Sequence, residues 1–145
     1  MRNKGRIVTG YARMWPREVF DVRKNDDFLK EAKDLLKSPG VYVLYRDEEP
    51  HYIGKTSRSL WLRIHDHTKS TDKLYNFWNY FSAFEVPGEE HDRDEIEAIL
   101  IASMPTANSS NPKFQPIPLP KQVSAGLSER RRIDVEHPRL QTTKK

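Results

Sequence analysis

The sequence contains no cysteine among its 145 residues. A disulfide framework and a thiolate metal site are therefore excluded, and any bound metal must use oxygen or histidine ligands. Long apolar runs are also missing, because the longest, around residues 99–102, is far shorter than the ~20 residues that cross a membrane. The basic N-terminus, with Arg2, Lys4 and Arg6, lacks the apolar segment of a signal peptide. We expect a soluble cytoplasmic protein with no membrane partner.

Apolar residues are scarce, at 36% of the chain, which favours one small domain with solvated ends. The charge is distributed unevenly along the sequence. Residues 1–39 hold 10 Lys/Arg against 6 Asp/Glu, residues 40–115 hold 8 against 12, and residues 116–145 hold 7 against 3. Attraction for a phosphate backbone must therefore come largely from the basic ends, unless their charges are simply solvated.

Hydrophobic periodicity predicts a helix, a hairpin, a helix, a strand and a helix, in that order. Helices are expected over residues 26–37, 59–68 and 94–104, with a short one over 73–80 capped by Asp72, and strands over 41–46, 51–56 and 81–86. The economical packing is a small α/β fold of the α+β kind, with about three antiparallel strands flanked by helices.

Three segments follow from this pattern. Residues 1–39 form a basic N-terminal segment with a helix, and residues 40–115 form the central domain. Residues 116–145 form a basic tail in which Pro116, Pro118 and Pro120 favour extended, non-helical backbone. We expect this tail to be flexible, because it has little apolar content with which to pack.

The predicted hairpin carries two tyrosines, Tyr42 and Tyr52, whose relative position depends on the strand register. They project from one face only if the numbers of opposed residues add to an even total, which requires a turn of odd length. The four residues 47–50 alone would not meet this condition. In the even register Gly54 lies beside Tyr42 and leaves open backbone where a substrate group could approach. The alternative is two half-buried strand tyrosines and a bulge glycine.

The helix that follows the hairpin presents a basic face. Arg63 and His67 are one helical turn apart on the same side, whereas His65 points elsewhere. An arginine offers a fork of donors to a phosphate, and a neighbouring histidine accepts or relays a proton near neutral pH. The pair suits phosphodiester chemistry, and the alternative is a solvated Arg/His face.

Glu97 interrupts the apolar stripe of the last predicted helix, which includes residues 100–104. A carboxylate buried without a partner is costly, so a cation is expected beside it. That cation is either a metal ion or an arginine in a structural ion pair, such as Arg63 or Arg93.

Together these residues resemble the GIY-YIG nuclease family over about residues 40–108. The family pattern corresponds, in order, to Gly40-Val41-Tyr42, Tyr52-Ile53-Gly54, Arg63 with His67, Glu97 with Leu100-Ile101, and Pro105 with Asn108. Each short motif is weak alone, because three-residue matches are common. Five of them in the right order and approximate spacing are specific.

The resemblance implies a metal-dependent DNA endonuclease that hydrolyses a phosphodiester bond. One divalent ion, Mg²⁺ or Mn²⁺, would be held by Glu97 and the scissile phosphate. Tyr42 would be the general base, as a phenolate or through a water, with help from His67 or Lys55. A phenol with a reference pKa of about 10 needs such help to act at neutral pH.

The resemblance also assigns supporting roles. Arg63 would neutralise the charge that develops on the phosphate, and Tyr52 would orient water or phosphate through its hydroxyl. Asn108 would support the residues that contact the substrate or the metal, with Asn111 as the alternative.

Two other functions compete with this one. A catalytically inactive module of the same fold would bind nucleic acid through its basic ends and the aromatic run 74–78, unless those aromatic residues belong to the core. A metal hydrolase of small substrates would instead need a deep apolar pocket.

Overall fold

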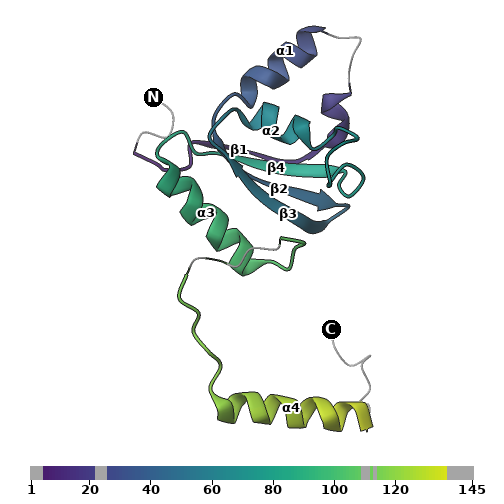
Figure 1. Cartoon of the computed structure of the whole chain (residues 1–145), viewed down its shortest axis with the longest axis vertical. Helices are drawn as coiled ribbons and strands as arrows, with labels where there is room; N and C mark the ends of the chain where they lie inside the picture. The colour runs from purple at the N-terminus through teal and green to yellow at the C-terminus, as the bar shows by residue number, and fades with distance from the viewer. Residues whose placement is uncertain (1–4, 22–25, 109–111, 113, 137–145) are drawn as a thin grey trace. The chain divides into compact units, whose positions relative to one another are not determined.

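The computed structural model describes residues 5–21, 26–108, 112 and 114–136. The chain divides into two units, residues 1–113 and 114–145, which are described separately. The first unit holds a four-stranded antiparallel sheet in the order β1-β4-β2-β3 (Figure 1). Its elements are β1 Gly10–Pro16, the 3-10 helix η1 Arg17–Phe20, α1 Asp26–Leu35, β2 Gly40–Arg46, β3 Glu49–Thr56, α2 Leu60–Asp66, β4 Tyr80–Glu85 and α3 Glu90–Ser103.

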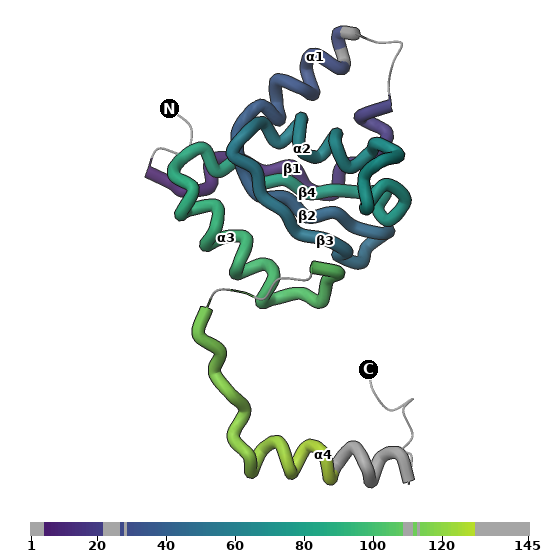
Figure 2. The backbone as a smooth tube through the Cα atoms, in the orientation of Figure 1, coloured from purple at the N-terminus to yellow at the C-terminus, as the bar shows by residue number. Residues whose placement is uncertain are grey.

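The sheet lies between two helical layers (Figures 1 and 2). One face packs against α1 and α2, and the residues buried there include Ala32, Leu36, Tyr42, Leu44, Leu60, Ile64 and Phe81. The other face packs against α3, and its cluster includes Val41, Val43, Ile53, Val86, Ile96, Leu100 and Met104. Because side chains alternate along a strand, neighbouring residues of β2 and β3 serve different cores.

The α+β architecture predicted from the sequence is confirmed, and most predicted elements lie within a few residues of the observed ones. Ser59 caps α2, because its Oγ accepts a hydrogen bond from the Leu62 N–H at 3.0 Å. The helix α3, the last one that the sequence predicts, begins at Glu90, four residues before the expected start at Asp94.

The expectation of three strands was wrong, because β1 adds a fourth at the edge beside β4. Its pattern does not alternate cleanly. The pairing with β4 shifts between Ala12 and Trp15, Met14 has a φ of +53°, and Tyr11 is exposed. A bulge breaks the two-residue period from which a strand is predicted.

The short helix expected over residues 73–80 was also wrong, since turns occupy this stretch. Asp72 does cap the backbone locally, because its carboxylate accepts a hydrogen bond from the Leu74 N–H at 2.8 Å. Leu74 and Trp78 then enter the core. Burial of these two side chains takes precedence over local helix propensity.

The second unit begins as expected, with no helix or strand over Pro116–Pro120. The helix α4, Lys121–Glu136, follows, and the sequence pattern did not predict it. Low apolar content opposes packing but does not oppose a helix, and this segment contains no proline. Val123 and Leu127 are exposed on it. In the described part of the chain, no helix has both the length and the apolar character needed to span a membrane.

Candidate functional site

Tyr42 and Tyr52 project from the same face of the β2–β3 hairpin. Tyr42 lies opposite Gly54, and Leu44 lies opposite Tyr52, so that opposed residue numbers add to an even total. The two phenol rings are 6.5 Å apart between centroids. The even register, which is required for both tyrosines to lie on one face, is therefore present.

A bulge at His51 produces this register. Nearer the turn Tyr45 pairs with Pro50, so His51 lies opposite no residue of β2. The turn itself is the pair Asp47-Glu48, with Asp47 at a φ of +56°. A two-residue turn alone would place Tyr52 on the face opposite to Tyr42. The additional residue of the bulge returns Tyr52 to the same face.

Gly54 lies directly against the phenol of Tyr42. A Cβ at this position would be 2.3 Å from Tyr42 Oη and 2.4 Å from its Cζ. The backbone and the phenol therefore meet at a distance that only glycine allows. The space over Gly54, expected from the sequence to admit a substrate group, is filled by Tyr42 itself.

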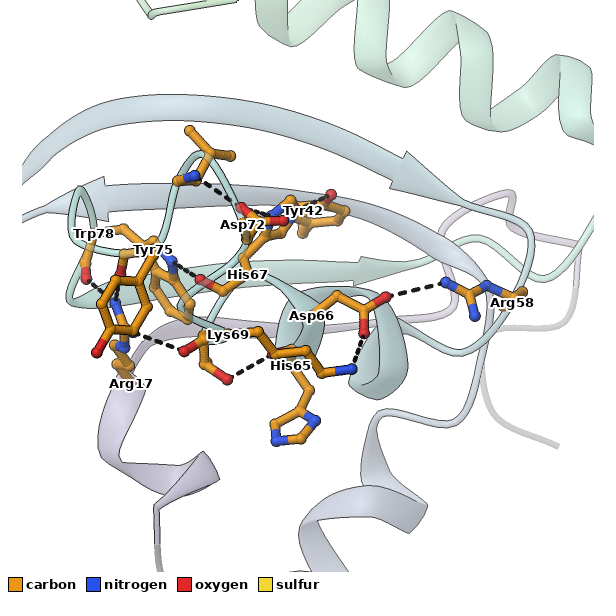
Figure 3. Close-up of polar contacts among 12 residues, drawn as sticks. Arg17, Tyr42, Arg58, His65, Asp66, His67, Lys69, Asp72, Tyr75 and Trp78 are labelled. Atoms are coloured by element: carbon orange, nitrogen blue, oxygen red, sulfur yellow. Dashed lines mark hydrogen bonds and ion pairs between the residues drawn. The ribbon is translucent and has the colours of Figure 1, made fainter.

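A buried hydrogen-bonded chain begins at Tyr42 (Figure 3). Tyr42 Oη is 2.8 Å from His67 Nε2, and His67 Nδ1 is 3.1 Å from Asp72 Oδ1. Tyr42 has 0% of its surface exposed and His67 has 2%. The Trp78 indole donates to the His67 carbonyl at 3.1 Å and fixes the backbone at the end of α2. The order phenol, imidazole, carboxylate is an arrangement along which a proton can be passed.

The protonation states follow from burial. Burial raises the pKa of the Tyr42 phenol well above its usual range, although Arg63 acts to lower it, so Tyr42 keeps its proton at neutral pH. Burial also lowers the pKa of His67, against the opposing effect of Asp72. A neutral His67 therefore accepts from Tyr42 at Nε2 and donates from Nδ1 to Asp72.

Asp72 belongs to the candidate site, although the sequence pattern predicts only a helix cap at this position. Burial acts to raise its pKa, but hydrogen bonds from His67 and from the Leu74 N–H hold that pKa below its usual value. Its position five residues after His67 gave no signal, because the turns between them have no periodicity.

The loop that carries Asp72 is held in place by Arg17 (Figure 3). The Arg17 guanidinium donates to the carbonyls of Tyr75 and Trp78 and lies over both of their rings. It also donates to the Thr68 carbonyl at 3.4 Å. One side chain from η1 therefore organises both ends of the loop. The sequence gives no indication of a contact between residues this far apart.

Arg63 joins the two tyrosines from α2. Burial raises the pKa values of Tyr42 and Tyr52, and the charge of Arg63 acts to lower both. Arg63 lines a pocket of about 340 Å³ together with Lys55, Thr56, Ser57, Arg58, Glu90 and Arg93. This concentration of cationic side chains is suited to an anion.

Glu97 and Lys55 belong to the other side of the sheet. Lys55 follows Gly54 on β3 and forms an ion pair with Asp94 of α3. That hydrogen bond is the main cause of its raised pKa, and Glu97 adds to the effect. Glu97 is half-buried and also helps burial to raise the pKa of Tyr52. The charge of Glu97 on α3 is therefore electrostatically coupled to Tyr52 on β3, an edge strand of the sheet.

The arginines suggested as structural partners of Glu97 have other contacts. Arg93 is buried and donates to the carbonyls of Val86 and Gly88, at 3.0 and 2.8 Å. Arg63 interacts with the two tyrosines and with Asp66. Among the described residues, no group of three or more His, Asp or Glu side chains forms a ready-made metal cage.

His65 is separated from this cluster, in agreement with the helical geometry. Its ring stacks on Trp61, with centroids 6.0 Å apart, and lies 5.6 Å from the ring of Phe20. The histidine that contacts Tyr42 is His67.

Asn108 binds the backbone of the second tyrosine motif. Its Oδ1 accepts from the Ile53 N–H at 2.9 Å, and its Nδ2 donates to the Ile53 carbonyl at 2.7 Å. Thr106 donates to the same Oδ1 at 2.9 Å. The amide thus acts as a neighbouring strand would and holds the position of Tyr52. The alternative, Asn111, lies outside the described residues.

Acid should destabilise the protein through His67. Because the folded-state pKa is lowered, the unfolded chain binds more protons as pH falls below about 6.5, and the free energy of unfolding decreases there. Burial lowers the pKa of His65 too, so both histidines contribute. Urea denaturation between pH 5 and pH 8 should show a flatter pH dependence for His67→Gln than for the unaltered chain. An undiminished dependence in His67→Gln, with His65→Gln as the comparison, would contradict the assignment.

No family model, curated protein or solved structure matches this chain.

Proposed function

We propose that this chain is a metal-dependent DNA endonuclease of the GIY-YIG kind. The observation that carries the proposal is the meeting of Tyr42, Tyr52, Arg63 and His67 between the hairpin and α2, with Glu97 of α3 electrostatically coupled to Tyr52. Phenols, a guanidinium, an imidazole and a carboxylate provide the groups that phosphodiester hydrolysis needs.

A divalent ion fits the donors that are present. Mg²⁺ is commonly bound through one or two carboxylates together with waters and substrate phosphate oxygens, so a closed protein cage is not required. Glu97 is the carboxylate that would hold the ion, as the resemblance implies. Asp94, on the same helix, forms an ion pair with Lys55. A bound Mg²⁺ would act as a Lewis acid on the phosphate oxygens.

The Tyr42–His67–Asp72 chain provides a route for the proton of the attacking water. When Tyr42 accepts that proton it passes its own to His67 Nε2, so no free phenolate is needed despite its raised pKa. Asp72 stabilises the imidazolium that results. Tyr42 is completely buried, so this transfer requires substrate binding to displace one of the half-buried side chains, Tyr52 or Arg63.

The remaining side chains act on the phosphate. The Arg63 fork neutralises charge that develops on the phosphorus oxygens, and the Tyr52 hydroxyl orients water or phosphate. Asn108 positions Tyr52 through the Ile53 backbone. Lys55, paired with Asp94, neutralises the acidic face of α3 rather than assisting Tyr42.

Nicking of a supercoiled plasmid tests the proposal. The unaltered chain should convert it to the open form with Mg²⁺ or Mn²⁺ and should not do so with excess chelator. Restoring Mg²⁺ to the chelated sample should restore nicking. Equal nicking with chelator would contradict a metal-dependent reaction.

A catalytically inactive nucleic-acid-binding module is the second candidate, and the complete burial of Tyr42 favours it. It predicts binding to DNA with no nicking under any metal condition. A hydrolase of small substrates is less well supported, because the pocket beside Arg63 is lined by cationic side chains.

A further inference from the structure

His51, which is half-buried, and Phe77, which is exposed, form an aromatic pair beside Tyr52. Their rings are stacked, with centroids 5.6 Å apart and an angle of 16° between the planes. Phe77 has 47% of its surface exposed, although an apolar ring of this size is usually covered. The roles proposed above for the catalytic residues use neither ring.

Specific features of the backbone place both rings close to the candidate site. His51 is the bulged residue of β3, and a bulge turns a side chain away from the regular alternation. Phe77 lies in the loop held by Arg17, between the buried anchors Leu74 and Trp78. The aromatic run 74–78 is therefore divided, because its ends belong to the core and Phe77 faces solvent.

A pocket of about 360 Å³ adjoins the pair, and it is lined by His51, Tyr52, Lys73, Leu74, Phe77, Ala107 and Asn108. One wall is thus the candidate catalytic residue Tyr52, and another is the aromatic pair. Lys73 is exposed at this pocket and adds a positive charge. A nucleotide, which joins a flat base to a phosphate, matches an aromatic surface next to the Lys73 amine.

We propose that His51 and Phe77 stack an unpaired nucleobase next to the phosphodiester that is cleaved. In a duplex both faces of each base are covered by its neighbours, so a base reaches this pair only from a single strand, a branch or an extruded position. The inference rests on the proposed nuclease function for its location, and it adds a substrate class: DNA with unpaired nucleotides at the cut.

Binding measured with chelator present tests the stacking separately from cleavage. The probe is a fluorescein-labelled single-stranded 12-mer, with fluorescence anisotropy as the readout. Phe77→Ala should weaken binding roughly tenfold to a hundredfold, and Phe77→Leu should weaken it similarly. Phe77→Trp should bind about as tightly as the unaltered chain. Tyr11→Ala is the matched control, because Tyr11 is an exposed aromatic residue on the opposite edge strand, and it should leave binding unchanged.

An abasic scan shows whether Phe77 contacts a base. One abasic position of the 12-mer should weaken binding to the unaltered chain but not to Phe77→Ala, because that base and that ring are the two halves of one contact. If the effects of Phe77→Ala and every abasic position simply add, the stacking proposal is wrong.

Cleavage then distinguishes the two proposals. With Mg²⁺, a duplex carrying an unpaired bulge should be cut faster than the matched full duplex, and Phe77→Ala should remove the difference. If Phe77→Ala and one abasic position have coupled effects on binding but no DNA is cleaved, the nuclease function is overturned and the stacking site remains. Equal cleavage of both duplexes, unaffected by Phe77→Ala, would overturn the stacking site alone.

Discussion

Glu97→Ala should abolish Mg²⁺-dependent cleavage while the chain keeps its fold. The side chain is half-buried on α3 and its charge raises the pKa of Tyr52 in addition to the effect of burial, and here it would hold the ion against the substrate phosphate. Losing several kcal/mol of transition-state stabilisation corresponds to at least about a thousandfold decrease in kcat. Plasmid nicking over a range of Mg²⁺ concentrations measures this loss.

Glu95→Ala is the matched control, since Glu95 lies on the same helix and is solvent-exposed. It removes the same charge from the chain, so a general electrostatic effect on DNA binding would appear in both variants. Circular dichroism and thermal melting should show both variants folded. Full activity in a folded Glu97→Ala protein would overturn the metal assignment.

Tyr42→Phe should decrease kcat by roughly a hundredfold to ten-thousandfold, the range expected for loss of a proton-transfer group. The phenylalanine ring still fills the core beside Gly54, but His67 Nε2 loses its partner. An unsatisfied buried nitrogen costs about 1–3 kcal/mol of stability, so the fold should survive with a lower unfolding midpoint. KM should change little, because Tyr42 is covered before substrate binds.

The control for this variant is Tyr45→Phe, which removes a phenol hydroxyl from the same strand, β2. Single-turnover cleavage of an end-labelled duplex with the two variants separates the chemical step from product release. Unchanged single-turnover rates for Tyr42→Phe would contradict a proton relay through His67.

Local patterns were enough to predict the parts of the molecule that depend on neighbouring residues. The hairpin strands, the cap at Ser59 and the common face of Arg63 and His67 all arise from spacings of a few residues. The sequence allows the even register, but the cause of that register, the bulge at His51, has no signature in the sequence. A bulge leaves no periodic signal, since it is a break in the period.

Distant contacts explain what was missed. Strand β1 pairs with residues about seventy positions later, and its own alternation is broken near Met14. Arg17 finds its carbonyl partners 51 to 61 residues away. Asp72 reaches His67 through turns that exist because Leu74 and Trp78 are buried. Each of these features depends on tertiary packing, which a single sequence does not encode in a local pattern.

The amide of Asn108 also bears on how the molecule avoids self-association. An edge strand with unpaired peptide groups invites strand addition by another copy and thereby aggregation. On β3 the Ile53 peptide is occupied by Asn108, and the His51 carbonyl accepts from the Ala107 N–H at 2.7 Å. At the other edge, the Met14 N–H of β1 turns inward to Ser82 Oγ at 3.0 Å. Both edges are thereby blunted, so contacts that shape a site beside Tyr52 also protect the sheet from joining another.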